Sequence, residues 1–238
     1  MLIMAEFNNL ILFVICLLPS LTFWVSASIL HLLGANKDYI ISHHSNAPTL
    51  KKMFQSRLSI DFLQFIFTLP RIFIEANNSF LQVRVHKLII GLLIIELVEY
   101  FAHRSMHTFP ILNKLHKKHH ALSPVHTLGA YYNSFGEICF TGSVLGICLT
   151  QVGKLGLLET AIVSSIGTFF TIYEHTPSSF WGASDKGKRT KTLSRHEIHH
   201  SICSTSNYAQ PFSGFMDYLF GTRYEDVIKR RELLFKKM

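Results

Sequence analysis

The sequence is short of charged residues. Only 16% of its 238 residues are Asp, Glu, Lys or Arg, whereas 48% are hydrophobic. In soluble domains about a quarter of all residues are charged, so this chain has too little polar surface for a water-soluble protein of its size. The composition also excludes a disordered chain, a collagen and a coiled coil.

Cysteine is also scarce. The four cysteines lie far apart, and Cys16, Cys139 and Cys148 fall in apolar stretches, which argues against a disulfide scaffold or a cysteine-type zinc finger. The formal net charge is +8, but the basic residues cluster between apolar runs instead of forming a stripe interleaved with aromatic residues. This pattern indicates membrane topology and no nucleic-acid partner. The sequence carries no dinucleotide-binding fingerprint and no fused haem domain.

Long apolar runs are present instead. Residues 10–33 exceed the roughly 20 residues that a helix needs to cross a bilayer, and no basic residue precedes them, so a membrane helix fits better than a signal peptide. Residues 58–74 are shorter and contain Asp61, so they could cross the membrane, lie at its surface or pack inside the protein. Further apolar runs cover residues 88–101, 131–152 and 155–173, the last two forming a predicted hairpin. We therefore expect an all-α integral membrane protein with four to five membrane-embedded helices.

The positions of Lys and Arg predict which side of the membrane each loop faces. The loop after the first apolar run, the segment after the third and the C-terminal tail are rich in basic residues, so all three should be cytoplasmic. Arg84 and Lys87 are the exception, because they fall in a loop that should be lumenal.

Histidine is abundant, with 14 in the chain, and eight of these form three boxes. The spacings are HxxxH, HxxHH and HxxHH, and residues three and four apart lie on one face of a helix, so each box presents its imidazoles together. Eight imidazoles exceed what one ion accepts, which predicts two metal ions in a cytoplasmic, histidine-rich helical cap. The eight are His103, His107, His116, His119, His120, His196, His199 and His200.

The ligands alone leave the chemistry open, because imidazole binds zinc, copper, iron and nickel. Two redox metals at the mouth of apolar helices suggest oxygen chemistry on a C–H bond of a lipid, whereas zinc would favour hydrolysis. Residues 196–200 also read HExxH, so a membrane zinc metallopeptidase with Glu197 as general base is an alternative. That alternative leaves the first two boxes without a role.

Polar residues near the boxes are candidates for orienting the ligands. Imidazoles on a metal usually donate their second N–H to a carboxylate, carbonyl or water, and Glu99 lies one turn before His103. Glu197 and Asp217 are further candidates, although each could equally be a solvated charge or pair with a lysine. Asn207 could cap the turn after the third box.

The order of the three boxes resembles the fatty acid hydroxylase / sterol desaturase superfamily, over roughly residues 88–226. Residues 207–222 (NYAQPFSGFMDYLFGT) are similar to a stretch of the sphingoid-base 4-hydroxylase branch. We expect N-terminal membrane anchor helices in residues 1–87 and a fatty acid hydroxylase-like catalytic domain in residues 88–238.

The resemblance implies a non-haem di-iron monooxygenase of the endoplasmic reticulum membrane, with its boxes facing the cytoplasm. Such an enzyme uses dioxygen to hydroxylate carbon 4 of sphinganine or dihydroceramide in sphingolipid biosynthesis. Its electrons come from NAD(P)H through a membrane-bound haem electron-transfer protein and its reductase. The eight box histidines would be catalytic iron ligands, and His175 would be a ninth metal ligand.

The same resemblance also allows a sterol methyl oxidase or a sterol desaturase. The chain departs from the family at Ser134, where relatives usually have a histidine, and after His175, where Thr176 and Pro177 replace the usual residues. A metal-binding membrane protein that has lost catalysis therefore stays open as an alternative.

Overall fold

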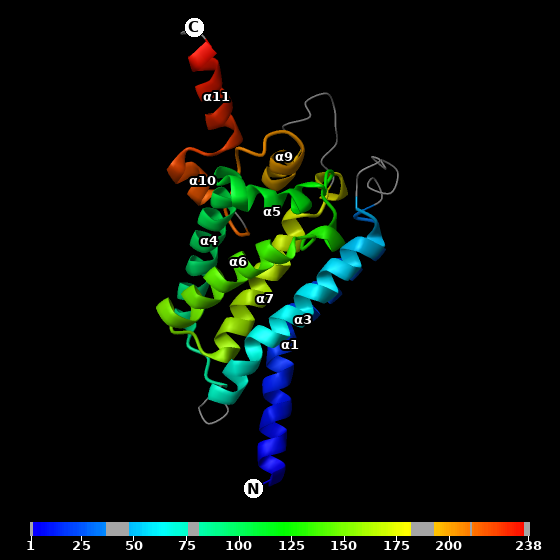
Figure 1. The fold of residues 1–238 in the computed structure, drawn as a ribbon, viewed down its shortest axis with the longest axis vertical. Helices are drawn as coiled ribbons and strands as arrows, with labels where there is room; N and C mark the ends of the chain where they lie inside the picture. Colours follow the sequence, from blue (N-terminus) through cyan, green and yellow to red (C-terminus); the bar gives the residue numbers. More distant parts are fainter. Residues whose placement is uncertain (1, 37–47, 76–80, 182–192, 210, 236–238) are drawn as a thin grey trace.

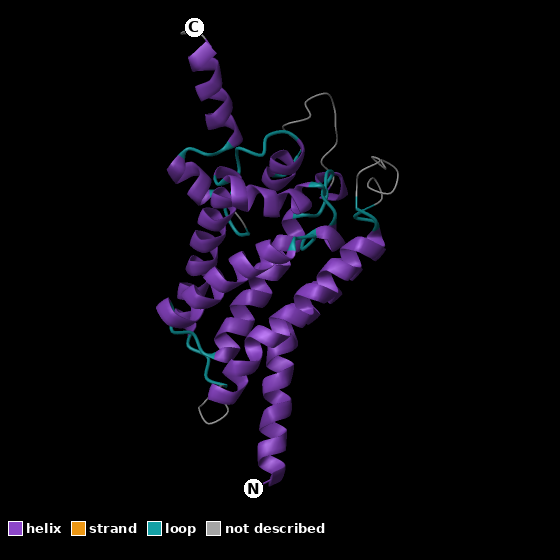
Figure 2. Cartoon of the chain, in the orientation of Figure 1, coloured by secondary structure: helices purple, strands orange, loops and turns teal. Residues whose placement is uncertain are grey.

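A computed structural model describes residues 2–36, 48–75, 81–181, 193–209 and 211–235. Within these residues the chain is helical, with no β-strand, which confirms the predicted all-α class (Figure 2). The main helices are α1 (Leu2–Leu32), α3 (Leu50–Glu75), α4 (Val85–Thr108), α5 (Pro110–His120), α6 (Phe135–Ile147), α7 (Leu157–Glu174), α9 (Arg195–Ser201), α10 (Phe215–Phe220) and α11 (Tyr224–Phe235).

The long helices run between the two ends of the molecule, as Figure 1 shows. Helices α1, α4 and α7 run towards the end where α5 and α9 lie, and α3 and α6 run away from it. The three histidine boxes therefore lie at one end of the bundle, and the end of α3, the start of α4 and the connection from α6 to α7 lie towards the other.

Every predicted apolar run lies in a helical region, but within the described residues only two windows are long and apolar enough to count as candidate membrane spans. These are Leu10–Leu32 in α1 and Phe135–Val152, which comprises α6 and a π-helical turn, η2 (Cys148–Val152). Many apolar side chains on α1 face outwards, including Leu21, Val25 and Ile29, and such a surface suits contact with lipid. That four to five helices enter the membrane stays a prediction.

One predicted boundary is wrong. The run at residues 131–152 does not begin as a helix at Tyr131. Residues Thr127–Gly129 form a short 3-10 helix, η1, and α6 starts only at Phe135. Ser134 is the reason, since its Oγ accepts a hydrogen bond from the backbone N–H of Glu137 at 3.2 Å and caps the helix. The residue that departs from the family pattern thus has a local structural role.

Helix α7 holds the bundle together. Leu12 and Cys16 of α1 pack against Leu157 and Ala161 at one level, and at another level Phe23 of α1 packs against Ile172.

On another side of α7, Gly91 of α4 approaches closely. A Cβ at this position would lie 2.7 Å from a methyl of Leu155 and 3.0 Å from one of Val163. The absence of a side chain lets α4 and α7 bring their far ends, which carry His103 and His175, to one place.

The two basic residues that broke the topology rule are held by hydrogen bonds. Arg84 donates from Nε and from its guanidinium NH2 to the buried carboxylate of Glu159, at 2.9 and 2.8 Å. Lys87 Nζ donates to the carbonyl of Gly153 at 2.8 Å. The contacts bind the start of α4 to the first turn of α7 and to the connection that precedes it, so these cations serve the packing of the bundle.

Candidate metal centre

Four elements deliver the histidines. His103 and His107 occupy the last turns of α4, and all three histidines of the second box lie on α5. Helix α9 carries the third box and is capped by Ser194, whose Oγ accepts from the backbone N–H of Glu197 at 3.1 Å. His175 is the residue at which α7 ends.

The structure brings all nine predicted histidines together, in two groups. Within each group, one ring nitrogen of every histidine lies within 4.8 Å of those of the others. The larger group, here called the five-histidine cluster, contains His103, His107, His116, His120 and His199. The smaller group, the four-histidine cluster, contains His119, His175, His196 and His200.

Each HxxHH box divides its final pair between the two clusters. His119 belongs to the four-histidine cluster and His120 to the five-histidine cluster, and on α9 His200 and His199 divide in the same way. Adjacent residues point to different sides of a helix, so a helix that runs between two sites can serve both. This arrangement agrees with the expectation of two ions.

The separations of the ring nitrogens suit shared ions. Nε2 of His120 lies 3.1 Å from Nε2 of His107 and 3.1 Å from Nε2 of His199. In the other cluster, Nε2 of His196 lies 3.0 Å from Nε2 of His175. Two metal–nitrogen bonds of about 2.1 Å at a right angle place their nitrogens about 3.0 Å apart, so these spacings fit neighbouring ligands on one ion.

Backbone carbonyls fix the tautomer of three imidazoles. Nδ1 of His103 donates to the carbonyl of Tyr208 at 3.0 Å, and Nδ1 of His199 donates to that of Ser206 at 2.7 Å. Nδ1 of His175 donates to the carbonyl of Thr171 at 2.8 Å. Because each Nδ1 carries the proton, the lone pair is on Nε2, as a metal ligand requires.

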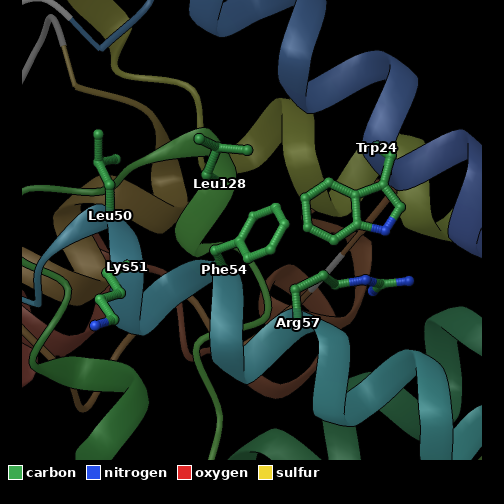
Figure 3. Close-up of a pocket in the computed structure, with 6 residues that line it drawn as sticks. All are labelled: Trp24, Leu50, Lys51, Phe54, Arg57 and Leu128. Atoms are coloured by element: carbon green, nitrogen blue, oxygen red, sulfur yellow. The ribbon is translucent and has the colours of Figure 1, made fainter.

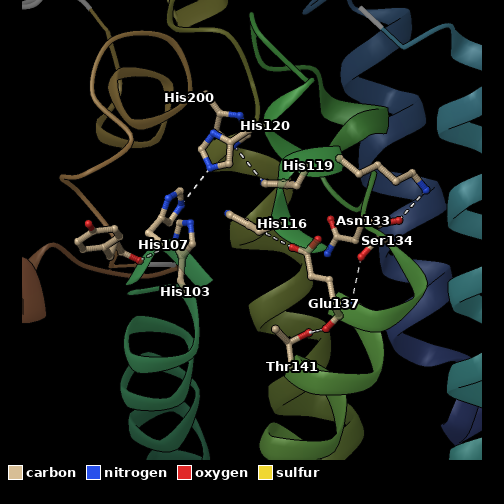
Figure 4. Close-up of polar contacts among 12 residues, drawn as sticks. His103, His107, His116, His119, His120, Asn133, Ser134, Glu137, Thr141 and His200 are labelled. Carbon is tan, nitrogen blue, oxygen red and sulfur yellow. Dashed lines mark hydrogen bonds and ion pairs between the residues drawn. The ribbon is translucent and has the colours of Figure 1, made fainter. Parts of the chain in front are cut away.

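Glu137 provides the corresponding contact for His116. Its Oε1 lies 2.7 Å from Nδ1 of His116, and both side chains are buried (Figure 4). Nε2 of His116 and Nε2 of His103 are buried and have no hydrogen-bond partner among the described residues. A bound cation would satisfy both nitrogens, so the residues present fit a metal ion.

Burial keeps the imidazoles neutral. Loss of solvation lowers the pKa of His103 and that of His175 to about 4, each against a small opposing effect from a backbone carbonyl. Burial, followed by repulsion from neighbouring imidazoles, lowers the pKa of His120 to about 3. At neutral pH these rings are therefore uncharged and able to bind a cation.

Glu137 and the three carbonyls were not among the residues predicted to orient the ligands. Glu137 could have been found, because it is the single charged residue in the apolar run at 131–152, and an ionisable residue in such a run usually has a function. The carbonyls of Thr171, Ser206 and Tyr208 have no signal in the sequence, since every residue has a carbonyl.

The predicted carboxylates have other partners. Glu99, expected to orient His103, makes no hydrogen bond to any of the nine histidines in the part of the chain that the structure describes, and the carbonyl of Tyr208 takes that role. Glu197 accepts from the hydroxyl and the backbone N–H of Ser178, at 2.6 and 3.2 Å. It thereby joins α9 to the 3-10 helix η3 (Ser178–Trp181).

Asp217 and Asn207 hold the segment that follows α9. Asp217 accepts from the backbone N–H groups of Tyr208 and Ala209, both at 2.9 Å. Asn207 donates to the carbonyl of Arg195 at 3.1 Å and adopts a left-handed backbone conformation, with φ of 55°. Both residues act on the metal centre indirectly, by placing the carbonyls that His103 and His199 require.

Comparison with known proteins gives a family and several relatives. The family model for fatty acid hydroxylase matches residues 88–222. The chain is 25% identical over 160 residues to sphinganine C4-monooxygenase 1 of Arabidopsis thaliana, covering 66% of this chain and 62% of that protein. It is 30% identical over 142 residues to a sphingolipid C4-hydroxylase of Saccharomyces cerevisiae, covering 58% and 40%.

A methylsterol monooxygenase of Aspergillus fumigatus is also similar, with 29% identity over 147 residues, which cover 56% of this chain and 46% of that protein. The chain thus spans less than two thirds of each of these relatives, and no solved structure gives a significant match. The family match covers more than half of the chain and contains all nine clustered histidines. The chain therefore belongs to the fatty acid hydroxylase family.

Proposed function

We propose that this protein is a di-iron, oxygen-dependent lipid hydroxylase of the endoplasmic reticulum membrane that hydroxylates carbon 4 of sphinganine or dihydroceramide. The division of nine histidines, seven of them buried, into two clusters carries the proposal, because it would provide separate sites for two ions. The similarity to sphingolipid C4-hydroxylases supports the substrate.

The donor set is compatible with redox metals and argues against a cysteine-type structural zinc site. Every clustered side chain is a neutral nitrogen donor, and no cysteine belongs to either cluster among the described residues. Two iron ions bound there would supply the activation of dioxygen. Electrons would reach them from NAD(P)H through a membrane-bound haem electron-transfer protein and its reductase.

The chain's own residues would hold the ions, shield them from water and orient the imidazole ligands. Carbonyls of Tyr208 and Ser206 and the carboxylate of Glu137 fix three imidazoles of the five-histidine cluster. Burial of the clusters excludes water, which protects a reactive centre from side reactions. The apolar helices beneath the clusters would let a lipid chain approach from the bilayer, with the clusters facing the cytoplasm.

A zinc peptidase fits the geometry less well. His196 and His200 lie in the four-histidine cluster beside His119 and His175, which leaves little room for the water that a catalytic zinc requires. Glu197, the general base of that mechanism, is engaged by both the hydroxyl and the N–H of Ser178.

A sterol substrate is the second candidate, because the chain is also similar to a methylsterol monooxygenase. The histidine clusters would serve both reactions. The identity of the lipid product would distinguish sphingoid-base hydroxylation from sterol oxidation.

Lipid analysis tests the proposal. Cells that lack sphinganine 4-hydroxylase activity would express the chain, the variant His119→Ala or the control His86→Ala, whose histidine is exposed and outside both clusters. We expect 4-hydroxylated long-chain bases with the unaltered chain and the control, and none with His119→Ala.

Other results would reject parts of the proposal. Loss of methyl sterols without new hydroxylated bases would favour the sterol oxidase. About two irons per purified chain without any lipid product would favour a metal-binding protein without catalysis. About one zinc per chain, with an activity lost in Glu197→Gln, would favour the peptidase.

A further inference from the structure

A cavity of about 260 Å³ lies between α1, α3 and η1, apart from the two histidine clusters (Figure 3). Four of its lining side chains are apolar, namely Trp24, Leu50, Phe54 and Leu128. The other two are the basic residues Lys51 and Arg57, and no acidic side chain lines it. The cavity therefore suits a ligand that is largely apolar and carries a negative charge at one end.

Arg57 forms a fixed part of the wall. It is 2% exposed, pairs with Asp61 at 2.6 Å, and its guanidinium lies over the rings of Phe23 and Tyr131 at 4.2 and 4.7 Å. Trp24 is held by the same carboxylate, because its Nε1 donates to Asp61 at 2.8 Å. The wall is thus rigid before any ligand arrives, and the charge of Arg57 is already balanced.

The charges of Lys51 and Lys52, in contrast, are not balanced by an acidic side chain among the described residues. Both are exposed in the first turn of α3, a turn that contains no acidic residue, and neither forms an ion pair with a described residue. Two cations in the first turn also oppose the dipole of their own helix, so a nearby anion would relieve an unfavourable arrangement.

We propose that this cavity binds an anionic phospholipid of the surrounding bilayer. One acyl chain would fill the apolar space beside Trp24 and Phe54, and the headgroup would lie against Lys51 and Lys52. Basic residues between membrane helices at the cytoplasmic surface are suited to such headgroups. The cationic amine of sphinganine would be repelled by these lysines, and none of the clustered histidines lines the cavity, so the site is distinct from that of the proposed reaction and does not depend on catalysis.

The two tryptophans of the chain offer a direct measurement. In the variant Trp181→Phe, the full chain keeps Trp24 as its single tryptophan. Bromine atoms on an acyl chain quench indole fluorescence at short range. The protein would be reconstituted in nanodiscs of phosphatidylcholine with increasing fractions of brominated phosphatidylserine, or of brominated phosphatidylcholine as the zwitterionic comparison.

We expect brominated phosphatidylserine to quench Trp24 at a low mole fraction and to saturate, and brominated phosphatidylcholine to quench only in proportion to its abundance. In the double variant Lys51→Gln/Lys52→Gln, the half-saturating fraction should rise about tenfold. The control Lys114→Gln/Lys117→Gln removes the same charge from two exposed lysines on α5 and should leave the titration unchanged.

A further variant, Leu128→Phe, fills the cavity without changing the charge, and it should abolish saturation. Equal quenching by the two lipids would overturn the proposal. The proposal would also fail if Lys51→Gln/Lys52→Gln titrates like the control, because the lysines would then not bind the headgroup. It would fail as well if Leu128→Phe titrates like the unaltered protein, because the lysines would then attract lipid without using the cavity.

Discussion

The contact between His116 and Glu137 shows how one side chain can set the properties of a ligand. The 2.7 Å separation of Nδ1 and Oε1 is that of a strong hydrogen bond, and both groups are buried. The carboxylate holds the ring in place and makes Nε2 a better donor to a cation.

We expect Glu137→Gln to weaken metal binding by about 10- to 100-fold, because the neutral amide keeps the shape but loses the charge. Titration of the purified protein with an iron chelator would measure the change. Glu99→Gln is the matched control, since Glu99 is a glutamate on α4 with no hydrogen bond to the clustered histidines in the described part of the chain. Equal losses in the two variants would contradict the role given to Glu137.

At this scale the sequence predicts the ligands better than their supports. Spacings of three and four residues are local, so the boxes are visible without any tertiary information. His116 and Glu137 are 21 residues apart, and His103 and Tyr208 are 105 apart. Contacts of that kind depend on how helices pack, which is why Glu99, a local neighbour of His103, was predicted in place of the carbonyl of Tyr208.

The segment between α9 and α11 is mostly irregular in its described residues, but hydrogen bonds anchor it. Glu96 of α4 accepts from the hydroxyl of Ser213 at 2.6 Å, and the hydroxyl of Thr222 donates to Asp217 at 2.7 Å. The segment therefore carries the carbonyls of Ser206 and Tyr208 to the five-histidine cluster.

We expect Asp217→Asn to lower the iron content from about two ions towards one per chain, because only the five-histidine cluster relies on the carbonyls that Asp217 places. Elemental analysis of the purified protein would measure this. Asp226→Asn on α11 is the control, since Asp226 pairs with Arg223 and contacts neither cluster. Unchanged iron in Asp217→Asn, or equal loss in both variants, would refute this dependence.

Elements are predicted well where apolar runs are long and less well at their ends. The five apolar runs all fall in helical regions, because a run of that length has few other ways to satisfy its backbone in an apolar setting. The predicted start of α6 is four residues too early, since a single cap at Ser134 decides it and the aromatic rings of Tyr131 and Tyr132 extend the apolar run beyond the helix.

At the scale of the whole molecule, nine neutral histidines make stability depend on pH. His103 and His175 keep a pKa of about 4 in the folded protein, whereas the unfolded chain takes up these protons below about 6.5. The unfolded state thus binds more protons in this range, and protonation favours it.

We expect the free energy of unfolding of the metal-free protein to decrease as the pH falls from about 6.5 towards about 4, and to vary little above about 7. Thermal unfolding in nanodiscs at a series of pH values would measure this. A melting temperature that stays constant down to pH about 5 would contradict the burial of neutral imidazoles.

The division of each HH pair between the two clusters has a mechanical consequence. Neighbouring Cα atoms are about 3.8 Å apart, so α5 and α9 each act as a spacer of fixed length between the two sites. A rotation of either helix that disturbed one site would disturb the other at once. Single-residue insertions between His119 and His120 or between His199 and His200 would therefore displace ligands of both sites, whereas Asp217→Asn, which leaves the two helices in place, would affect one site.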